Sequence, residues 1–234
     1  MHPIEPPRAM KTLLPIAIIV ATVTGLQAQT KPQVIARDAH SRTWQWETPI
    51  ERLDGKTEMI QHGYVEVGSG ICRWNDKEEK WLDASEVIEV FPGGAIGRSA
   101  QIQATFAPTL FGNINTISPD GNRITSQVLG LAFYDLALQK SVMIASVKDC
   151  AGAVLPPNQV IYRDAFDGGI LADVIYTYKL GSFHQDIVLR SQLPVTPEDY
   201  EFNSDTTVLE VWTEMMSDRE PRRVPQPAAA MLRP

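Results

Sequence analysis

The residues of this sequence that could do chemistry are a histidine, several carboxylates and a generous set of aromatic rings. His184 and Asp186 lie two residues apart in a run of strand-forming residues, so their side chains are expected on one face of a strand. Such a pair could act in acid–base catalysis or bind a metal ion, but a metal site needs three or four convergent ligands. The sequence offers no further ligand at a suitable spacing. It therefore favours a solvated pair on the surface of a sheet.

The aromatic residues give a second chemical signal. Tryptophan and tyrosine combine a large apolar ring with a polar group, which suits either a buried core or an exposed surface that stacks on sugar rings. The sequence contains five tryptophans: Trp44, Trp46, Trp74, Trp81 and Trp212. Burial in a β core is the commoner outcome for such rings. If a glycan is bound, the candidate stacking residues are Trp74, Trp81 and Tyr178.

Sequence motifs of well-known reactions are missing. The chain has no Gly-rich phosphate loop, G-x-S-x-G elbow, H-E-x-x-H pair or C-x-x-C motif. The run from Asp164 through Asp167-Gly168-Gly169 is only vaguely similar to a calcium loop, because the further oxygen ligands and the closing Glu are missing. No spacing singles out a pair of glycosidase carboxylates. The sequence therefore predicts a protein that is not an enzyme, with no catalytic, cofactor-binding or metal-binding residue and no cofactor.

The clearest structural pattern is a β-hairpin between Asp173 and Arg190. Residues 173–180 and 183–190 are rich in β-branched and aromatic types, and Gly181-Ser182 between them suits a two-residue type II′ turn. Pairing outward from that turn predicts four pairs on one face: Leu180 with Phe183, Tyr178 with Gln185, Tyr176 with Ile187, and Val174 with Leu189. A slip of one residue would mix the two faces, so the pattern specifies the register.

The two faces of this hairpin differ in character. One face is nearly all apolar, and we expect Tyr176, Tyr178 and Phe183 to be buried or half-buried against a second layer. A sugar-stacking platform built from the same three rings is the alternative. The other face is mixed and has an opposite-charge pair, Asp173 and Arg190, at its far end.

The remaining sequence consists of short strand patterns separated by Gly and Pro turns. Residues 126–134 and 140–147 are apolar on both faces and are expected to be central strands. Residues 62–67 and 71–74 are expected to be paired strands on either side of Gly68-Ser69-Gly70. This regular spacing predicts an all-β fold, an antiparallel β-sandwich-like domain built of hairpins.

The N-terminal residues predict export. Arg8 and Lys11 precede an uncharged run at 13–26 that is too short to span a bilayer comfortably, and Leu26-Gln27-Ala28 is an acceptable cleavage site. We therefore expect a signal peptide at 1–28, with Met10 as an alternative start. The predicted location is periplasmic, at the cell surface or extracellular, with no integral membrane span.

The predicted β-rich domain covers 29–216, beginning with a flexible lead-in at 29–39, and a different kind of segment follows it. Residues 217–234 are rich in Pro and Arg and have no apolar pattern, which is typical of a linker or of a truncated tail. The formal net charge of −7 argues against nucleic-acid binding. The two cysteines, Cys72 and Cys150, could form a disulfide in an exported protein, or both could be free buried thiols.

One segment also carries a family resemblance. It reads VIYRDAFDGG followed by ILADVIYTYKLGSFHQDIVLR, with Tyr162 and Asp164 at its opening, Phe166 before a glycine, and Tyr176 and Tyr178 at its centre. This pattern resembles a segment in the N-terminal, β-rich head of large secreted bacterial proteins, including wall-associated and RHS-repeat proteins. LGLAFYD followed by SVMIASVKD is similar to the hairpin that precedes it there. The resemblance covers about residues 74–193 and implies a structural or presenting role.

Three functional hypotheses follow. The favoured one is a non-catalytic exported structural or presenting module, the N-terminal part of a larger cell-surface or secreted protein. Its partners would be the rest of that polypeptide or other cell-surface components. The first alternative is a carbohydrate-binding module, with a glycan as the partner. The second alternative is a secreted hydrolase, suggested only by export and by abundant carboxylates.

Overall fold

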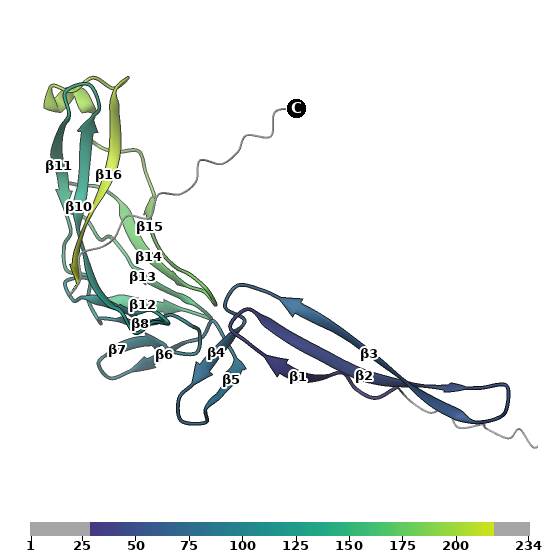
Figure 1. Ribbon diagram of the computed structural model, residues 1–234. Coiled ribbons are helices and arrows are strands. Elements are labelled where there is room, and N and C mark those ends of the chain that lie inside the picture. Colours follow the sequence, from purple (N-terminus) through teal and green to yellow (C-terminus); the bar gives the residue numbers. More distant parts are fainter. Residues whose placement is uncertain (1–28, 218–234) are drawn as a thin grey trace, which may run out of the picture. The chain divides into compact units, whose positions relative to one another are not determined.

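The computed structural model of the chain describes residues 29–217 (Figure 1). The predicted signal segment, and the predicted tail beyond Ser217, lie outside these residues. The described part contains sixteen β-strands, a 3-10 helix at Pro197–Tyr200 and no α-helix, and every strand pairing with a defined register is antiparallel. The predicted all-β, antiparallel class is confirmed. The described residues divide into two compact units. The smaller one contains 29–31 and 46–62, and the larger one contains 32–45 and 63–217.

The larger unit contains two facing sheets of unequal size. The seven-stranded sheet has the order β11-β10-β9-β8-β7-β6, and β16 pairs with β10 as well. Its strands are β6 (Ile88–Phe91), β7 (Gly94–Gly97), β8 (Gln103–Phe106), β9 (Ile114–Ile117), β10 (Arg123–Asp135), β11 (Lys140–Ser146) and β16 (Thr207–Ser217). Strand β10 is central, as expected for 126–134. Among the described strands, β11 pairs only with β10 and lies at the end of the strand order, so the expectation that 140–147 is central is wrong.

The second sheet is four-stranded, and a small hairpin stands beside it. The four-stranded sheet has the order β12-β13-β14-β15 and consists of β12 (Gly152–Leu155), β13 (Gln159–Tyr162), β14 (Ala172–Tyr178) and β15 (Phe183–Leu189). Strands β4 (Cys72–Asn75) and β5 (Lys80–Asp83) pair only with each other among the described strands. The core lies between the two larger sheets, where Phe106 packs against Tyr176 and Phe183. The sandwich-like arrangement is therefore as predicted.

The first strands of the described chain form a third sheet, in the order β1-β2-β3. These strands are β1 (Gln33–Arg37), β2 (Ser41–Glu51) and β3 (Thr57–Val67). The expectation of a flexible lead-in at 29–39 is wrong for 33–37, because β1 pairs with β2 around a bulge at Ile35. The expected pairing of 62–67 with 71–74 is wrong too, since β3 pairs with β2 and β4 with β5. In the smaller unit, the rings of Trp46 and His62 stack at 5.4 Å.

The predicted hairpin at Asp173–Arg190 forms, with its register shifted by two residues. Tyr178 lies opposite Phe183, and Tyr176 lies opposite Gln185. The turn residues are Leu180 and Gly181, because the N–H of Lys179 donates to the carbonyl of Ser182 at 2.9 Å. A shift of two keeps the side chains of both strands on their predicted faces, while Leu180 moves from the strand into the turn. Tyr176 and Tyr178 are accordingly buried and Phe183 is half-buried, as expected.

The charged end of the hairpin also forms as expected. Asp173 is buried, and its carboxylate accepts a hydrogen bond from the N–H of Asp164 at 2.8 Å. The Nε of Arg190 lies 3.2 Å from the same carboxylate, and Arg190 contacts Asp164 as well. The predicted Asp173–Arg190 pair therefore locks the β14–β15 hairpin to the loop that precedes β14.

Two buried tyrosines differ in one hydrogen bond. The Oη of Tyr162 donates to the carbonyl of Ala107 at 2.6 Å, whereas the Oη of Tyr176 is buried with no hydrogen-bond partner among the described residues. We expect Tyr162→Phe to lower the free energy of unfolding by about 1–2 kcal/mol, because a carbonyl loses its donor. We expect Tyr176→Phe to raise it by about 1 kcal/mol, because an unpaired hydroxyl leaves the core. Urea unfolding of both variants checks the signs, and a loss of stability in Tyr176→Phe would contradict the second expectation.

The loop between β10 and β11 is organised by one buried carboxylate. Asp135 accepts hydrogen bonds from the N–H of Ala137 at 2.8 Å and of Leu138 at 2.9 Å. It also accepts one from the N–H of Asn203 at 3.3 Å and one from the hydroxyl of Thr206 at 3.1 Å. The bond from Leu138 is the largest of the effects that hold the pKa of Asp135 below its ordinary value, while burial opposes them. One side chain thus ties the loop to the start of β16.

This lowered pKa gives the fold a specific acid sensitivity. Because the carboxylate has a lower pKa folded than unfolded, its stabilisation is complete above the ordinary value of 3.8 and is lost as the pH falls through the folded value. We expect Asp135→Asn to lower the melting temperature at pH 7, and the difference from the wild type to shrink as the pH falls from about 5 to about 2. The exposed Asp186→Asn variant is the control. A difference that stays constant over this range would contradict the expectation.

Candidate binding site

The two tryptophans of the β4–β5 hairpin lie next to each other beside a hollow of the larger unit. Trp74 and Trp81 lie directly opposite each other, and their rings meet edge to face with centroids 5.5 Å apart. The polar turn between them is held by Asn75, whose side-chain oxygen accepts a hydrogen bond from the N–H of Lys77 at 3.0 Å. Of the two rings, that of Trp74 is the more exposed, at 46%.

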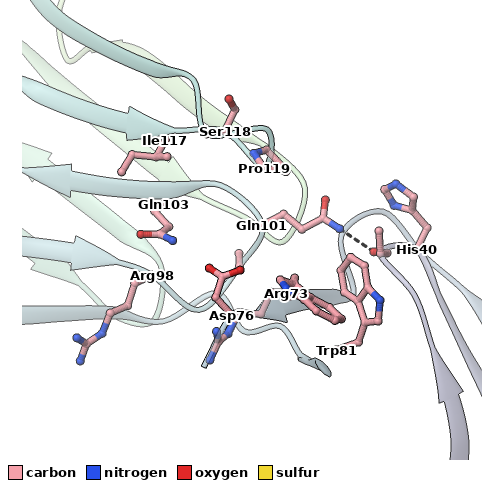
Figure 2. Close-up of a pocket in the computed structure, with 14 residues that line it drawn as sticks. His40, Arg73, Asp76, Trp81, Arg98, Gln101, Gln103, Ile117, Ser118 and Pro119 are labelled. Atoms are coloured by element: carbon pink, nitrogen blue, oxygen red, sulfur yellow. Dashed lines mark hydrogen bonds between the residues drawn. The ribbon is translucent and has the colours of Figure 1, made fainter. Parts of the chain in front are cut away.

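These two rings line a cleft of about 450 Å³, which we call the tryptophan cleft (Figure 2). Its volume falls in the range of about 300–1,000 Å³ that is typical of small-ligand sites. Side chains from four separate segments meet there: 39–40, the β4–β5 hairpin, 98–103 and the turn after β9. The polar or charged ones are His40, Arg73, Asp76, Arg98, Gln101, Gln103 and Ser118.

Gln101 holds the segments around the tryptophan cleft together. Its side-chain amide donates to the carbonyl of Ala39 at 2.8 Å, which is the dashed line in Figure 2, and to the carbonyl of Cys72 at 3.1 Å. His40 accepts a hydrogen bond from the N–H of Gly70 through Nδ1 at 3.3 Å, so the neutral ring carries its proton on Nε2. These bonds link the end of β1 to the start of β4 and fix the wall of the cleft.

The two arginines of the tryptophan cleft differ in their partners. On one wall, Arg98 makes a bidentate pair with Glu89. Arg73, by contrast, forms no ion pair within the described chain, and its Nε is buried without a hydrogen-bond partner. A buried polar hydrogen without an acceptor is unfavourable. The Arg73 guanidinium is therefore the cleft group with the clearest unmet need for a partner.

The third predicted stacking residue does not belong to this site. Tyr178 is completely buried, and its Oη accepts a hydrogen bond from the N–H of Ala100 at 2.7 Å. Its ring also lies so close to Gly97 that a β-carbon there would come within 2.8 Å of it. Tyr178 is a core residue, so its prediction as a glycan-stacking residue is wrong. The structure brings Trp74 and Trp81 together, whereas Tyr178 is buried in the core.

The two cysteines are free thiols. Cys72 is fully buried and Cys150 is half-buried, so the disulfide alternative is wrong and the free-thiol alternative holds. Burial raises the pKa of both thiols, and the neighbouring Asp149 raises that of Cys150 further. Neither thiol is activated as a nucleophile.

The other residues singled out for chemistry are dispersed. The side chain of His184 pairs with the hydroxyl of Ser182 at 2.9 Å, and Asp186 is exposed on the same strand. Asp167 accepts the N–H of Ser146 at 2.8 Å, while Asp164 contacts Arg190. Within residues 29–217, no three His, Cys, Asp or Glu side chains gather as metal ligands would.

Comparison with known proteins gives no relative from which a function could be transferred. The chain matches no protein-family model, no curated protein and no solved structure. The resemblance to the head region of RHS-repeat and wall-associated proteins stays a prediction. Within the described residues, no helix has the length and apolar character needed to cross a membrane.

Several cleft residues escaped the sequence analysis. Arg73 and Asp76 stand beside Trp74, but charged residues next to a turn are too common to indicate a site. His40 and Gln101 come from segments that are 61 positions apart, and only the fold places them together. One usable signal was the placement of Trp74 and Trp81 on either side of a polar turn, which predicts that the two rings are neighbours.

Proposed function

We propose that this chain is a non-catalytic structural and presenting module that attaches to other polypeptide as part of a larger exported protein. The observation that carries the proposal is strand β16. Within the described chain it pairs only with β10, so one edge has no strand beside it (Figure 1). Edge strands with unpaired backbone groups readily accept another strand.

The side chains of β16 strengthen this proposal. Six large apolar side chains are exposed along a single strand: Val208, Leu209, Val211, Trp212, Met215 and Met216. Edge strands are usually protected by Lys, Pro or inward-pointing charges, and β16 contains no Lys and no Pro. Such a surface is typical of an interaction site.

The charges of β16 indicate the kind of strand that would pair with it. Glu210 and Glu214 are its only charged residues, and they lie four positions apart on one face. Two copies paired about Trp212 would set Glu210 opposite Glu214, which is unfavourable. We therefore propose an extended segment of a partner polypeptide that alternates apolar residues with Lys or Arg.

Defined peptides test this docking proposal on the full chain. We expect a ten-residue peptide of alternating Val and Lys to bind and to protect β16 amides from hydrogen exchange. The matched Val and Glu peptide should bind at least about tenfold more weakly. Glu210→Lys together with Glu214→Lys should reverse the preference. Equal binding of the two peptides, or protection elsewhere than β16, would contradict the proposal.

A second measurement tests whether the chain is part of a larger protein. Sequencing the gene beyond the codon for Pro234 is expected to show an in-frame continuation that encodes further domains. A stop codon at that point would count against a head module, while leaving the peptide experiment unaffected.

A further inference from the structure

The tryptophan cleft has the composition of a sugar-binding site, and this inference is independent of the docking strand β16. Trp74 offers an exposed ring, and Trp81 meets it edge to face. An indole face packs well against the C–H groups of a pyranose ring, because both are flat and apolar. Hydrogen-bonding side chains around such a face then fix the orientation of the hydroxyl groups.

Two polar side chains of the cleft remain open to a ligand. Asp76 and Gln103 are exposed, and neither side chain has a hydrogen bond within the described chain. A carboxylate accepts hydrogen bonds from hydroxyl groups, and an amide both donates and accepts. Both side chains line the cleft together with Arg73, and all three are labelled in Figure 2. The cleft can therefore satisfy hydroxyl groups of a sugar whose ring lies on Trp74.

Arg73 indicates which class of sugar the cleft would bind. Its guanidinium forms no ion pair within the described chain, although Glu78 lies close enough to feel its charge, and its buried Nε has no acceptor. A guanidinium has a planar fork of donors that matches a carboxylate, and a neutral hydroxyl satisfies it less well. Arg98 is less suited to bind an anionic ligand, because its guanidinium is already paired with Glu89. Because no carboxylate of the described chain forms an ion pair with Arg73, an anionic ligand can take that position.

We propose that the tryptophan cleft binds an acidic glycan, with a pyranose ring on Trp74 and a sugar carboxylate on Arg73. Asp76 and Gln103 bind hydroxyl groups of the same or the next sugar. The overall net charge of −7 does not prevent this. Distant charges are screened over about 8 Å at physiological salt, whereas Arg73 acts by direct contact.

A matched pair of oligosaccharides tests the proposal by calorimetry on the full chain. The probes are cellotetraose and the same tetramer oxidised to glucuronate at every C6, at about physiological salt. We expect the oxidised tetramer to bind about 10-fold to 100-fold more tightly, as charge-assisted hydrogen bonds would give. Equal binding of the two tetramers, or no binding of either, would overturn the proposal.

Variants of the cleft assign the preference to its residues. Arg73→Met should bring the affinity for the oxidised tetramer down to that for cellotetraose, and Trp74→Ala should weaken both at least about tenfold. Arg163→Met and Phe111→Ala are the controls outside the cleft and should leave binding unchanged. A preference that survives in Arg73→Met would overturn the role of Arg73.

A measurement on the unmodified protein covers the case in which a variant does not fold. The chain has five indole N–H groups, which give separate signals in an amide correlation spectrum. The oxidised tetramer should shift those of Trp74 and Trp81 and leave those of Trp44, Trp46 and Trp212 in place. Shifts confined to the latter three would place the site elsewhere and refute the proposal.

Discussion

Gly70→Ala is expected to lower the free energy of unfolding by about 3 kcal/mol or more. Gly70 has a φ of +68°, and a β-carbon there would overlap the carbonyl oxygen of Leu180 and lie 2.7 Å from its carbonyl carbon. The obstacle is backbone on both sides, so no side-chain rotation can relieve it. Urea unfolding followed by tryptophan fluorescence measures the loss.

Gly169→Ala is the matched control for this substitution. Gly169 has a similar φ of +75°, but a β-carbon there would meet nothing within 4 Å. It should therefore cost only the strain of the left-handed backbone, about 1–2 kcal/mol. The difference between the two variants isolates the contact between the Gly70 turn and the β14–β15 turn. Equal losses would show that this contact does not constrain the fold.

Phe106→Ala should destabilise the larger unit by about 3–5 kcal/mol, as the loss of a buried aromatic ring usually does. Phe106 is completely buried, and its ring lies 6.0 Å from those of both Tyr176 and Phe183. Removing it empties the contact between the two sheets. Chemical unfolding measures the loss, which should exceed that of any single surface variant.

Phe111→Ala serves as the control, because that ring is 53% exposed. It should cost less than about 1 kcal/mol. If both substitutions cost the same, the core would not lie between the two sheets as described. A loss in Phe106→Ala of under 1 kcal/mol would have the same meaning.

The hairpin at Asp173–Arg190 shows how much of a structure can be predicted from the local sequence pattern. Alternation along the chain fixed which side chains point inward, and Tyr176, Tyr178 and Phe183 lie where this rule places them. The choice of turn was not local. Leu180 donates its N–H to Glu86 at 3.2 Å and packs against Gly70, and these distant contacts select Leu180-Gly181 over Gly181-Ser182.

The candidate site was predictable only in part, for a related reason. Trp74 and Trp81 flank one turn, so their proximity follows from the sequence nearby. Tyr178 was grouped with them as an aromatic residue, although its alternation with Tyr176 already placed it on the buried face. His40 and Gln101 reach the tryptophan cleft through hydrogen bonds to Gly70, Ala39 and Cys72 carbonyls or amides, and no sequence period encodes such contacts.

The pairing of the first strands was also beyond local pattern. Residues 33–37 contain only three apolar side chains and resemble a lead-in, yet they pair with β2. Arg37 and Arg42 both reach Asp83 on β5, at 3.2 and 3.3 Å. These ion pairs connect β1 and β2 with β5, and neither composition nor alternation predicts them.

The buried thiol of Cys72 can report how often the wall of the tryptophan cleft opens. Its carbonyl accepts a hydrogen bond from Gln101, and its side chain is shielded from solvent. A thiol reagent reaches the Cys72 side chain only while this part of the structure is open, so the rate of modification measures how often it opens. The ratio of this rate to that of the unfolded chain reports the local opening equilibrium. Half-buried Cys150, in the same molecule, provides the internal reference.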